Sequence, residues 1–310
     1  MTQVENQMDR ELMERVRKLA KEKNAVILAH NYQLPEIQEV ADLTGDSLAL
    51  AIEASKTAAD IIVFCGVHFM GESSAIICPD KKTILPVVEA GCAMADMLTA
   101  EELRAEKERL PGVPVVTYVN SSAEVKAESD ICCTSANVVQ VVKSLEGDEV
   151  LMTPDRNLAM WAQRHVDKKI HYWPGYCPVH NNLTVAALEK AKAEHPEAVV
   201  MAHPECPPEV IDMADVVRST SGMLTYARES EAREFIVATE VGLLYPLQKE
   251  NPGKRFYPAS PDMVCQDMKK TTLKDLLRAL EEEGPVITVE EEIRVKALKA
   301  LERMMAVPRD

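Results

Sequence analysis

Three cysteines recur at one position of an internal repeat. Three apolar segments, AVILAH, PVVTYVN and AVVMAH, end at His30, Asn120 and His203. The cysteines follow these residues after 62, 57 and 62 positions, each near a glycine or a proline: Cys92, Cys177 and Cys265. Repeated units bring equivalent residues together around a common axis, so we expect the three thiols to converge.

Three converging thiolates suit a soft metal centre. Structural zinc usually takes four protein ligands, whereas a 4Fe-4S cluster held by three cysteines leaves one iron open as a Lewis acid. The alternative is that the three residues are buried thiols in similar sheet environments, since free cysteine is among the most buried residue types. The spacing favours the metal centre.

The other five cysteines have simpler explanations. Cys65, Cys78, Cys132 and Cys133 lie in or beside apolar runs, so core packing accounts for them. Cys206, in HPECPPE, has no counterpart in the other repeats and is either structural or part of the site. The charged N-terminal segment is unlike a signal peptide, so we expect a cytoplasmic protein with reduced thiols.

A hydroxyl residue stands at the start of a helical stretch in each repeat. Ser47, Ser135 and Thr220 follow the strand-end residues after 17, 15 and 17 positions. A helix N-terminus offers unpaired backbone N–H groups to a carboxylate or a phosphate. Each hydroxyl could instead only cap its helix. Their shared register favours an anion site.

The repeat also predicts the fold. Strands alternate with helices in each unit, which indicates three small three-layer α/β domains with parallel sheets, related by pseudo-threefold symmetry around a central active site. The predicted domains cover residues 1–107, 108–190 and 191–273. Residues 274–310 are expected to form two helices that pack on the first domain. Ligands of open α/β sheets bind at the carboxyl ends of the strands, where the repeated residues fall.

Charge and missing motifs exclude several classes of function. The chain of 310 residues carries a formal net charge of -15, which repels nucleic acid and anionic membranes. The sequence contains no Gly-x-Gly, Walker or Cys-x-x-Cys motif. Any anionic ligand must therefore be held by local donors.

A family resemblance rests on many short motifs in order. They are AHNY at 29–32, GDSL at 45–48, YVNSSAEVKAESD at 118–130, CTSAN at 133–137, PGYCPVH at 174–180, HPEC at 203–206, STSGM at 219–223 and VCQDMKKTTL at 264–273. Together they resemble quinolinate synthase, from about residue 20 to the C-terminus.

The resemblance implies an activity, a cofactor and a set of site residues. It implies condensation of iminoaspartate with dihydroxyacetone phosphate to give quinolinate for NAD biosynthesis, with loss of phosphate and water. It places a 4Fe-4S cluster on Cys92, Cys177 and Cys265. The substrate contacts that it implies are His30, Ser47, Tyr118, Asn120, Ser135, His203, Glu205 and Thr220, with Tyr32 and His180 also lining the site. An aspartate-oxidising enzyme is the expected source of the imine.

Residue chemistry gives these positions roles. Condensation and dehydration need proton transfers, so Glu205 and Tyr32 are the candidate acid and base. His30 and Tyr118 are further candidates for catalysis, while His180 could instead support the Cys177 segment. Two alternatives are a zinc hydrolase, which lacks a His-Glu-x-x-His motif here, and an iron-sulfur sensor, which would need no acid and base.

Overall fold

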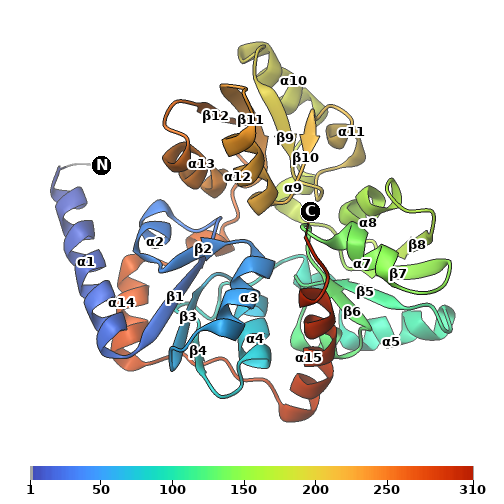
Figure 1. Cartoon of the computed structure of the whole chain (residues 1–310), viewed down its shortest axis with the longest axis horizontal. Coiled ribbons are helices and arrows are strands. Elements are labelled where there is room, and N and C mark those ends of the chain that lie inside the picture. Colours follow the sequence, from blue (N-terminus) through green and yellow to red (C-terminus); the bar gives the residue numbers. More distant parts are fainter. Residues whose placement is uncertain (1–2, 310) are drawn as a thin grey trace. The chain divides into compact units, whose positions relative to one another are not determined.

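Three parallel sheets form the framework of the molecule (Figure 1). The computed structural model describes residues 3–309, with side chains from Gln7 onward. Each sheet has four strands, and the strand order β2-β1-β3-β4 recurs as β6-β5-β7-β8 and as β10-β9-β11-β12. All strand pairs within the sheets are parallel. The predicted α/β class with three parallel sheets is confirmed.

The chain divides into two compact units, which are described separately. The first comprises residues 1–92 and 266–294, and the second comprises residues 93–265 and 295–310. The first sheet belongs to the first unit, and the other two sheets belong to the second unit. This division leaves the three predicted domain boundaries as a prediction.

The first unit contains one sheet with helices on both faces. Its strands are β1 (Ala25–His30), β2 (Leu43–Gly45), β3 (Ile61–Cys65) and β4 (Lys82–Ile84). Its helices are α1 (Gln3–Glu22), α2 (Pro35–Val40), α3 (Ser47–Lys56), α4 (His68–Ile77), the 3-10 helix η3 (Asp267–Lys269) and α14 (Leu273–Glu282). Helices α1, α2 and α14 cover one face of the sheet, and α3 and α4 pack against the strands from the other side (Figure 1).

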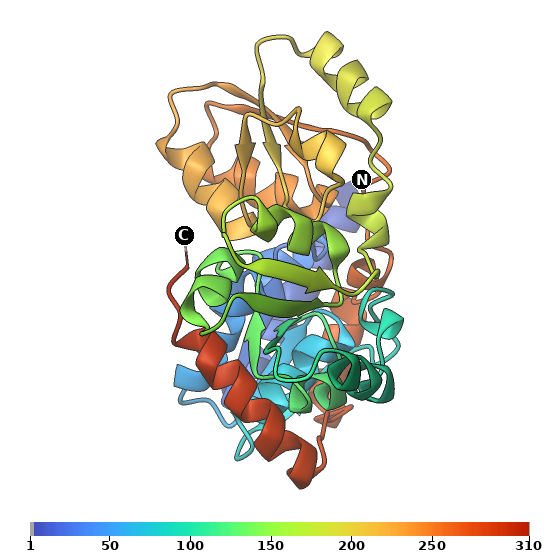
Figure 2. The same cartoon turned by 90° about the vertical axis from the view of Figure 1, so that its right-hand side faces the viewer.

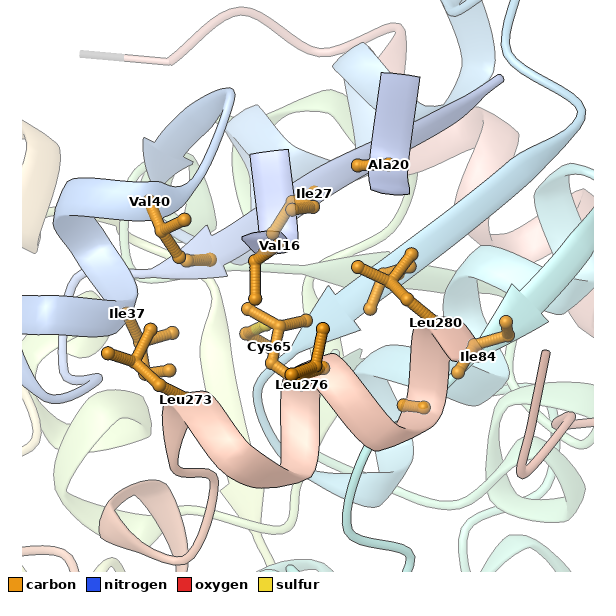
Figure 3. Close-up of a cluster of buried hydrophobic side chains, with 14 of the residues drawn as sticks. Val16, Ala20, Ile27, Ile37, Val40, Cys65, Ile84, Leu273, Leu276 and Leu280 are labelled. Atoms are coloured by element: carbon orange, nitrogen blue, oxygen red, sulfur yellow. The ribbon is translucent and has the colours of Figure 1, made fainter. Parts of the chain in front are cut away.

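A leucine stripe on α14 builds the core of this unit. Leu273, Leu276 and Leu280 fall on one side of the helix at intervals of three and four residues, the period of an amphipathic helix. Figure 3 shows them facing Val16 of α1 and Ile27 of β1. The predicted C-terminal helix therefore adds a layer to the first sheet.

Glu283, at the C-terminal end of α14, forms two ion pairs. Glu283 has a backbone φ of 51° and bonds to Lys23 at 2.8 Å and to Lys82 at 2.5 Å. The hydrogen bonds from these two ammonium groups lower the pKa of Glu283 to about 2. Its ionised form thus stabilises the folded unit.

The second unit holds the second and third sheets (Figure 2). The second sheet consists of β5 (Val115–Tyr118), β6 (Ile131–Cys133), β7 (Glu149–Thr153) and β8 (Lys169–Tyr172). The third consists of β9 (Val199–Ala202), β10 (Val216–Val217), β11 (Glu234–Ala238) and β12 (Arg255–Pro258). In Figure 2 the green strands β7 and β8 lie below the yellow and orange third sheet.

Helices and turns of the second unit connect these strands. They are η1 (Ala95–Met97), α5 (Ala100–Arg109), α6 (Ala123–Ala127), α7 (Val138–Ser144), α8 (Arg156–Gln163), α9 (Pro178–Asn181), α10 (Val185–Glu194), α11 (Pro208–Ile211), α12 (Thr220–Glu229), η2 (Val241–Leu243) and α13 (Leu244–Glu250). Helix α15 (Glu291–Met305) joins this unit from Val295 onward.

The two C-terminal helices differ in what they contact. Helix α14 packs on α1 in the first unit. Near the end of α15, the carbonyl of Met304 accepts from Asn137 Nδ2 at 3.1 Å, and Arg303 donates to the carbonyl of Asp130 at 2.6 Å. Packing of residues 274–310 on the first domain stays a prediction.

A short strand precedes the hydroxyl position in each repeat. Strands β2, β6 and β10 have only three, three and two residues. Each pairs along the first strand of its repeat and stops shortly before the hydroxyl position. Runs this short show no clear period, so the sequence did not indicate these strands.

Candidate active site

A buried carboxylate, Glu205, organises a polar cluster in the second unit. Its Oε1 accepts a hydrogen bond of 2.5 Å from the hydroxyl of Tyr118, at the end of β5. Its Oε2 lies 2.7 Å from His180 Nδ1 and 3.8 Å from His203 Nδ1. Glu205 is only 3% exposed, so these contacts replace water almost completely.

The surroundings of Glu205 favour its ionised form. Burial alone would raise the pKa of this carboxyl group, but His180, His203 and the hydrogen bond from Tyr118 outweigh burial and lower it. The nearby Asp155 behaves in the opposite way, because burial and the charge of Glu205 raise its pKa well above the usual value. The pair therefore concentrates its negative charge on Glu205.

The two strand-end histidines share one local geometry. The Nδ1 of His30 accepts from the backbone N–H of Tyr32 at 3.1 Å, and the Nδ1 of His203 accepts from that of Glu205 at 3.3 Å. His203 Nε2 lies 3.1 Å from the hydroxyl oxygen of Ser135. The repeat thus fixes the ring orientation through the backbone.

Asn120 occupies the corresponding strand-end position in the second repeat. Its side-chain oxygen Oδ1 is buried and has no hydrogen-bond partner among the residues that the structure describes. A buried, unsatisfied amide oxygen costs free energy unless a ligand or a solvent molecule pairs with it. This unsatisfied Oδ1 atom supports a ligand-binding role for Asn120.

Ser47 and Thr220 do not cap the helices that they open. Asp46 caps α3 by accepting from the backbone N–H of Ala49 at 2.8 Å, and Ser219 caps α12 by accepting from Gly222 at 3.1 Å. Ser47 and Thr220 are instead the first residues of these helices. The alternative that each hydroxyl serves only as a cap is therefore wrong for both.

The eight cysteines, all within the described residues, form no disulfide and fall into two groups. Five are buried: Cys65, Cys78, Cys132, Cys133 and Cys206. Desolvation by burial raises the pKa of these thiols, to about 12 for Cys65 and Cys132. The other three, Cys92, Cys177 and Cys265, are partly exposed. The two groups coincide with the division that the repeat suggested.

Two acidic residues that the sequence reasoning missed hold the cysteine loops. Asp155 Oδ2 accepts from the backbone N–H of Cys177 at 3.2 Å, and Glu240 Oε1 accepts from that of Cys265 at 3.1 Å. Both acids lie two residues after the third strand of their repeat, and each caps the helix that follows, α8 or the 3-10 helix η2. That common offset is the signal that could have revealed them.

These observations test whether the chain fits a 4Fe-4S cluster. The three partly exposed thiols occupy the same loop in each repeat, and buried carboxylates fix the backbone of two of them. Thiolates are the usual ligands of such clusters. The donor set therefore fits the group.

His180 links the cysteine loop to the carboxylate cluster. Its Nδ1 lies 3.1 Å from Cys177 Sγ, and its Nε2 lies 2.8 Å from the hydroxyl oxygen of Thr239. Its ring stacks on that of His203 with centroids 4.7 Å apart. His180 was expected either to line the site or to support Cys177, and its contacts are compatible with both roles.

A surface pocket adjoins this cluster. Its volume is about 330 Å³, and its lining includes Ser135, Lys143, Trp161, His165 and Arg218. Ser135 belongs to both the pocket and the cluster, since its hydroxyl contacts His203. Three of the lining side chains carry basic groups, which makes the pocket suitable for anions despite the negative net charge of the chain.

The structure distributes the predicted site residues over both units. Around Glu205 it brings together Tyr118, Ser135, Cys177, His180 and His203. Asn120, Thr220 and Cys265 belong to the same unit, and His30, Tyr32, Ser47 and Cys92 belong to the first unit. In the first unit, the carbonyl of Tyr32 accepts from Lys269, and its ring meets that of His30 edge-on with centroids 4.6 Å apart.

The fold and the site define a class of protein, an α/β enzyme with a buried carboxylate–histidine–tyrosine cluster beside a partly exposed cysteine. Comparison with known sequences then gives the family. A model of the family described as "Quinolinate synthetase A protein" matches residues 14–306. The chain belongs to this family.

Similar proteins span nearly the whole chain. A protein named quinolinate synthase from Geotalea uraniireducens is 56% identical, covering 97% of this chain and 99% of its own length. Another from Pelobacter propionicus is also 56% identical, with coverages of 98% and 100%. One from Methanosarcina barkeri is 52% identical, with coverages of 96% and 98%. Among the described helices, none is both long and apolar enough to cross a membrane.

Proposed function

We propose that the protein is an enzyme that condenses iminoaspartate with dihydroxyacetone phosphate to form quinolinate, with release of phosphate and water. Membership of the quinolinate synthetase A family carries this proposal, together with the identity of 52% to 56% over nearly full-length relatives. The buried cluster around Glu205 is the structural observation that supports it most strongly. Quinolinate formation would make the protein part of NAD biosynthesis.

The residues around Glu205 supply the proton transfers that the reaction needs. Glu205 is held ionised, so its Oε2 can accept a proton from a substrate carbon or nitrogen, while Oε1 keeps the hydroxyl of Tyr118 oriented. The Tyr118 hydroxyl is the nearest proton donor to that carboxylate at 2.5 Å. A Glu–Tyr pair of this kind can remove a proton at one atom of the substrate and return it at another.

Neutral polar groups would bind the charged substrates. We assign contacts with substrate oxygens and developing negative charge to His203, the Ser135 hydroxyl and the Asn120 carboxamide. In the first unit, we assign substrate contacts to His30, Ser47 and Tyr32, and in the second unit to Thr220. We assign His180 a further contact through its position between Cys177 and Glu205.

Cys92, Cys177 and Cys265 would hold the 4Fe-4S cluster. With three thiolate ligands, such a cluster offers one open iron that acts as a Lewis acid on a substrate oxygen when bound. Asp155 and Glu240 would keep two of the cysteine loops in place through backbone hydrogen bonds. We place the reaction in the cytoplasm, where thiols stay reduced.

The imine substrate implies a supplying reaction. Iminoaspartate hydrolyses readily in water, so an enzyme that oxidises aspartate must produce it close in time to its use. Functional coupling to such an aspartate-oxidising enzyme is therefore part of the proposal. No nucleic acid or membrane partner is proposed.

The direct test uses protein purified without oxygen. Iron and sulfide are measured, and quinolinate is assayed from dihydroxyacetone phosphate and freshly generated iminoaspartate. We expect about four irons and four sulfides per chain, with both cluster and product lost in Cys177→Ala. Cys206→Ala is the matched control, since Cys206 is buried and its Sγ contacts the carbonyl of Ala238.

Three other outcomes would contradict the proposal. A colourless wild-type protein that binds zinc and makes no quinolinate would indicate a hydrolase. A brown protein with a full cluster and no turnover would indicate an iron-sulfur sensor. Loss of the cluster in Cys206→Ala but not in Cys177→Ala would contradict the ligand assignment.

A further inference from the structure

Three different ligand atoms converge beside the proposed cluster position. The Cys177 thiol, His180 Nδ1 and a Glu205 carboxylate oxygen all lie within 4.8 Å of one another. His180 Nδ1 is 3.1 Å from the sulfur and 2.7 Å from Glu205 Oε2. Thiolate, imidazole and carboxylate are the three side-chain ligands that zinc takes in proteins.

Neighbouring groups orient two of these ligands, His180 and Glu205. His180 Nε2 lies 2.8 Å from the hydroxyl oxygen of Thr239, which fixes the ring and leaves Nδ1 directed at the other two ligands. Tyr118 holds Glu205 through Oε1, so Oε2 remains on the His180 side. Outer hydrogen bonds of this kind accompany most protein zinc sites.

We propose that the cluster-free protein binds one zinc ion through Cys177, His180 and Glu205, with solvent completing the coordination. Ligand atoms around a tetrahedral zinc lie about 3.3–3.8 Å apart, as follows from the usual metal–ligand distances. The observed separations of 2.7 Å and 3.1 Å must widen to reach these values, while the thiol and the carboxylate oxygen already lie within 4.8 Å of each other.

The zinc site and the iron-sulfur cluster exclude each other. Cys177 is a ligand in both, and one thiolate cannot occupy both positions at once. Zinc in the cluster-free protein would therefore block assembly of the iron-sulfur cluster. It would also prevent Glu205 from acting as an acid or a base. This consequence rests on the proposed function, whereas zinc binding itself does not.

Zinc titration of the cluster-free protein tests the site without any turnover assay. Protein stripped of iron under anaerobic conditions is titrated with Zn²⁺ against a chromophoric chelator, and zinc per chain is counted after desalting. We expect one zinc per chain in the wild type. Cys177→Ser and His180→Ala should each weaken binding at least tenfold, and Thr239→Val should weaken it about tenfold through the supporting hydrogen bond.

Matched cysteine variants separate this site from the cluster ligands. Cys92→Ser and Cys265→Ser remove proposed cluster ligands but none of the three zinc ligands, so both should keep wild-type zinc affinity while failing to assemble the cluster. Equal loss of zinc in these two variants would place the ion among the three cysteines and overturn the proposal. A wild type that takes up no zinc would also overturn it.

Cobalt binding provides a second readout, which reports directly whether a thiolate binds the metal. Co²⁺ bound through a thiolate gives a sulfur-to-metal charge-transfer band in the near ultraviolet. The band should appear in wild type, Cys92→Ser and Cys265→Ser, and disappear in Cys177→Ser. Circular dichroism confirms that each variant is folded. If quinolinate synthesis fails but these results hold, the proposed function is wrong and the zinc site stands.

Discussion

Removing one hydroxyl group tests the acid–base assignment most sharply. In Tyr118→Phe, the Glu205 carboxylate loses its 2.5 Å hydrogen bond while keeping His180 on the other oxygen. A hydrogen bond to a charged group contributes about 1.5–3 kcal/mol. If that energy is used in the transition state, kcat/KM falls about 10-fold to 150-fold, at 1.4 kcal/mol for each factor of ten.

The assay measures quinolinate formation by cluster-loaded protein, with iron content and thermal unfolding recorded for each variant. Tyr257→Phe is the matched control, because its hydroxyl donates to Glu234 at 3.3 Å in the same unit without being part of the site. Tyr257→Phe should keep wild-type kcat/KM. A Tyr118→Phe enzyme with full iron and rates within twofold of the control would refute the role of this hydroxyl.

Three further predictions concern stability and substrate capture. Leu276 lies on the buried side of α14, so Leu276→Ala should lower the free energy of unfolding by about 2–5 kcal/mol in denaturant titration. The pKa of Glu283 lies near 2, below its unfolded value, so its contribution is present above about pH 4.5 and disappears toward pH 2. Glu283→Gln should therefore unfold at a lower temperature at pH 7, and its deficit should shrink on acidification. Arg218→Ala should raise KM severalfold, leave kcat unchanged and weaken the salt dependence of kcat/KM, whereas the exposed Arg228→Ala should change none of these.

Residue spacing alone predicted the repeat, the bounds of one strand and the grouping of the cysteines. Strand β1 has the predicted bounds of Ala25–His30, because a buried parallel strand leaves a continuous apolar run that ends in polar residues. The same spacing separated Cys92, Cys177 and Cys265 from the buried thiols. Both results depend on patterns that are local in the sequence and repeated three times.

Other features could not be read from the sequence because they depend on contacts across the fold. Glu205 and Tyr118 are 87 residues apart, and only packing of the second and third sheets brings their side chains to 2.5 Å. The hydrogen bonds of Asp155 and Glu240 to the cysteine loops join residues 22 and 25 positions apart, so their partners lie outside any local pattern. The site roles themselves, and the domain boundaries, remain predictions for the experiments above.

The central claim is that this chain makes quinolinate, and a stoichiometric measurement addresses it most directly. Anaerobic, cluster-loaded protein is given ¹³C-labelled dihydroxyacetone phosphate and freshly generated iminoaspartate, and the label in quinolinate is compared with the phosphate released. We predict labelled quinolinate and one phosphate per molecule formed. Phosphate release without labelled quinolinate, or no product from protein with a full cluster, would contradict the account.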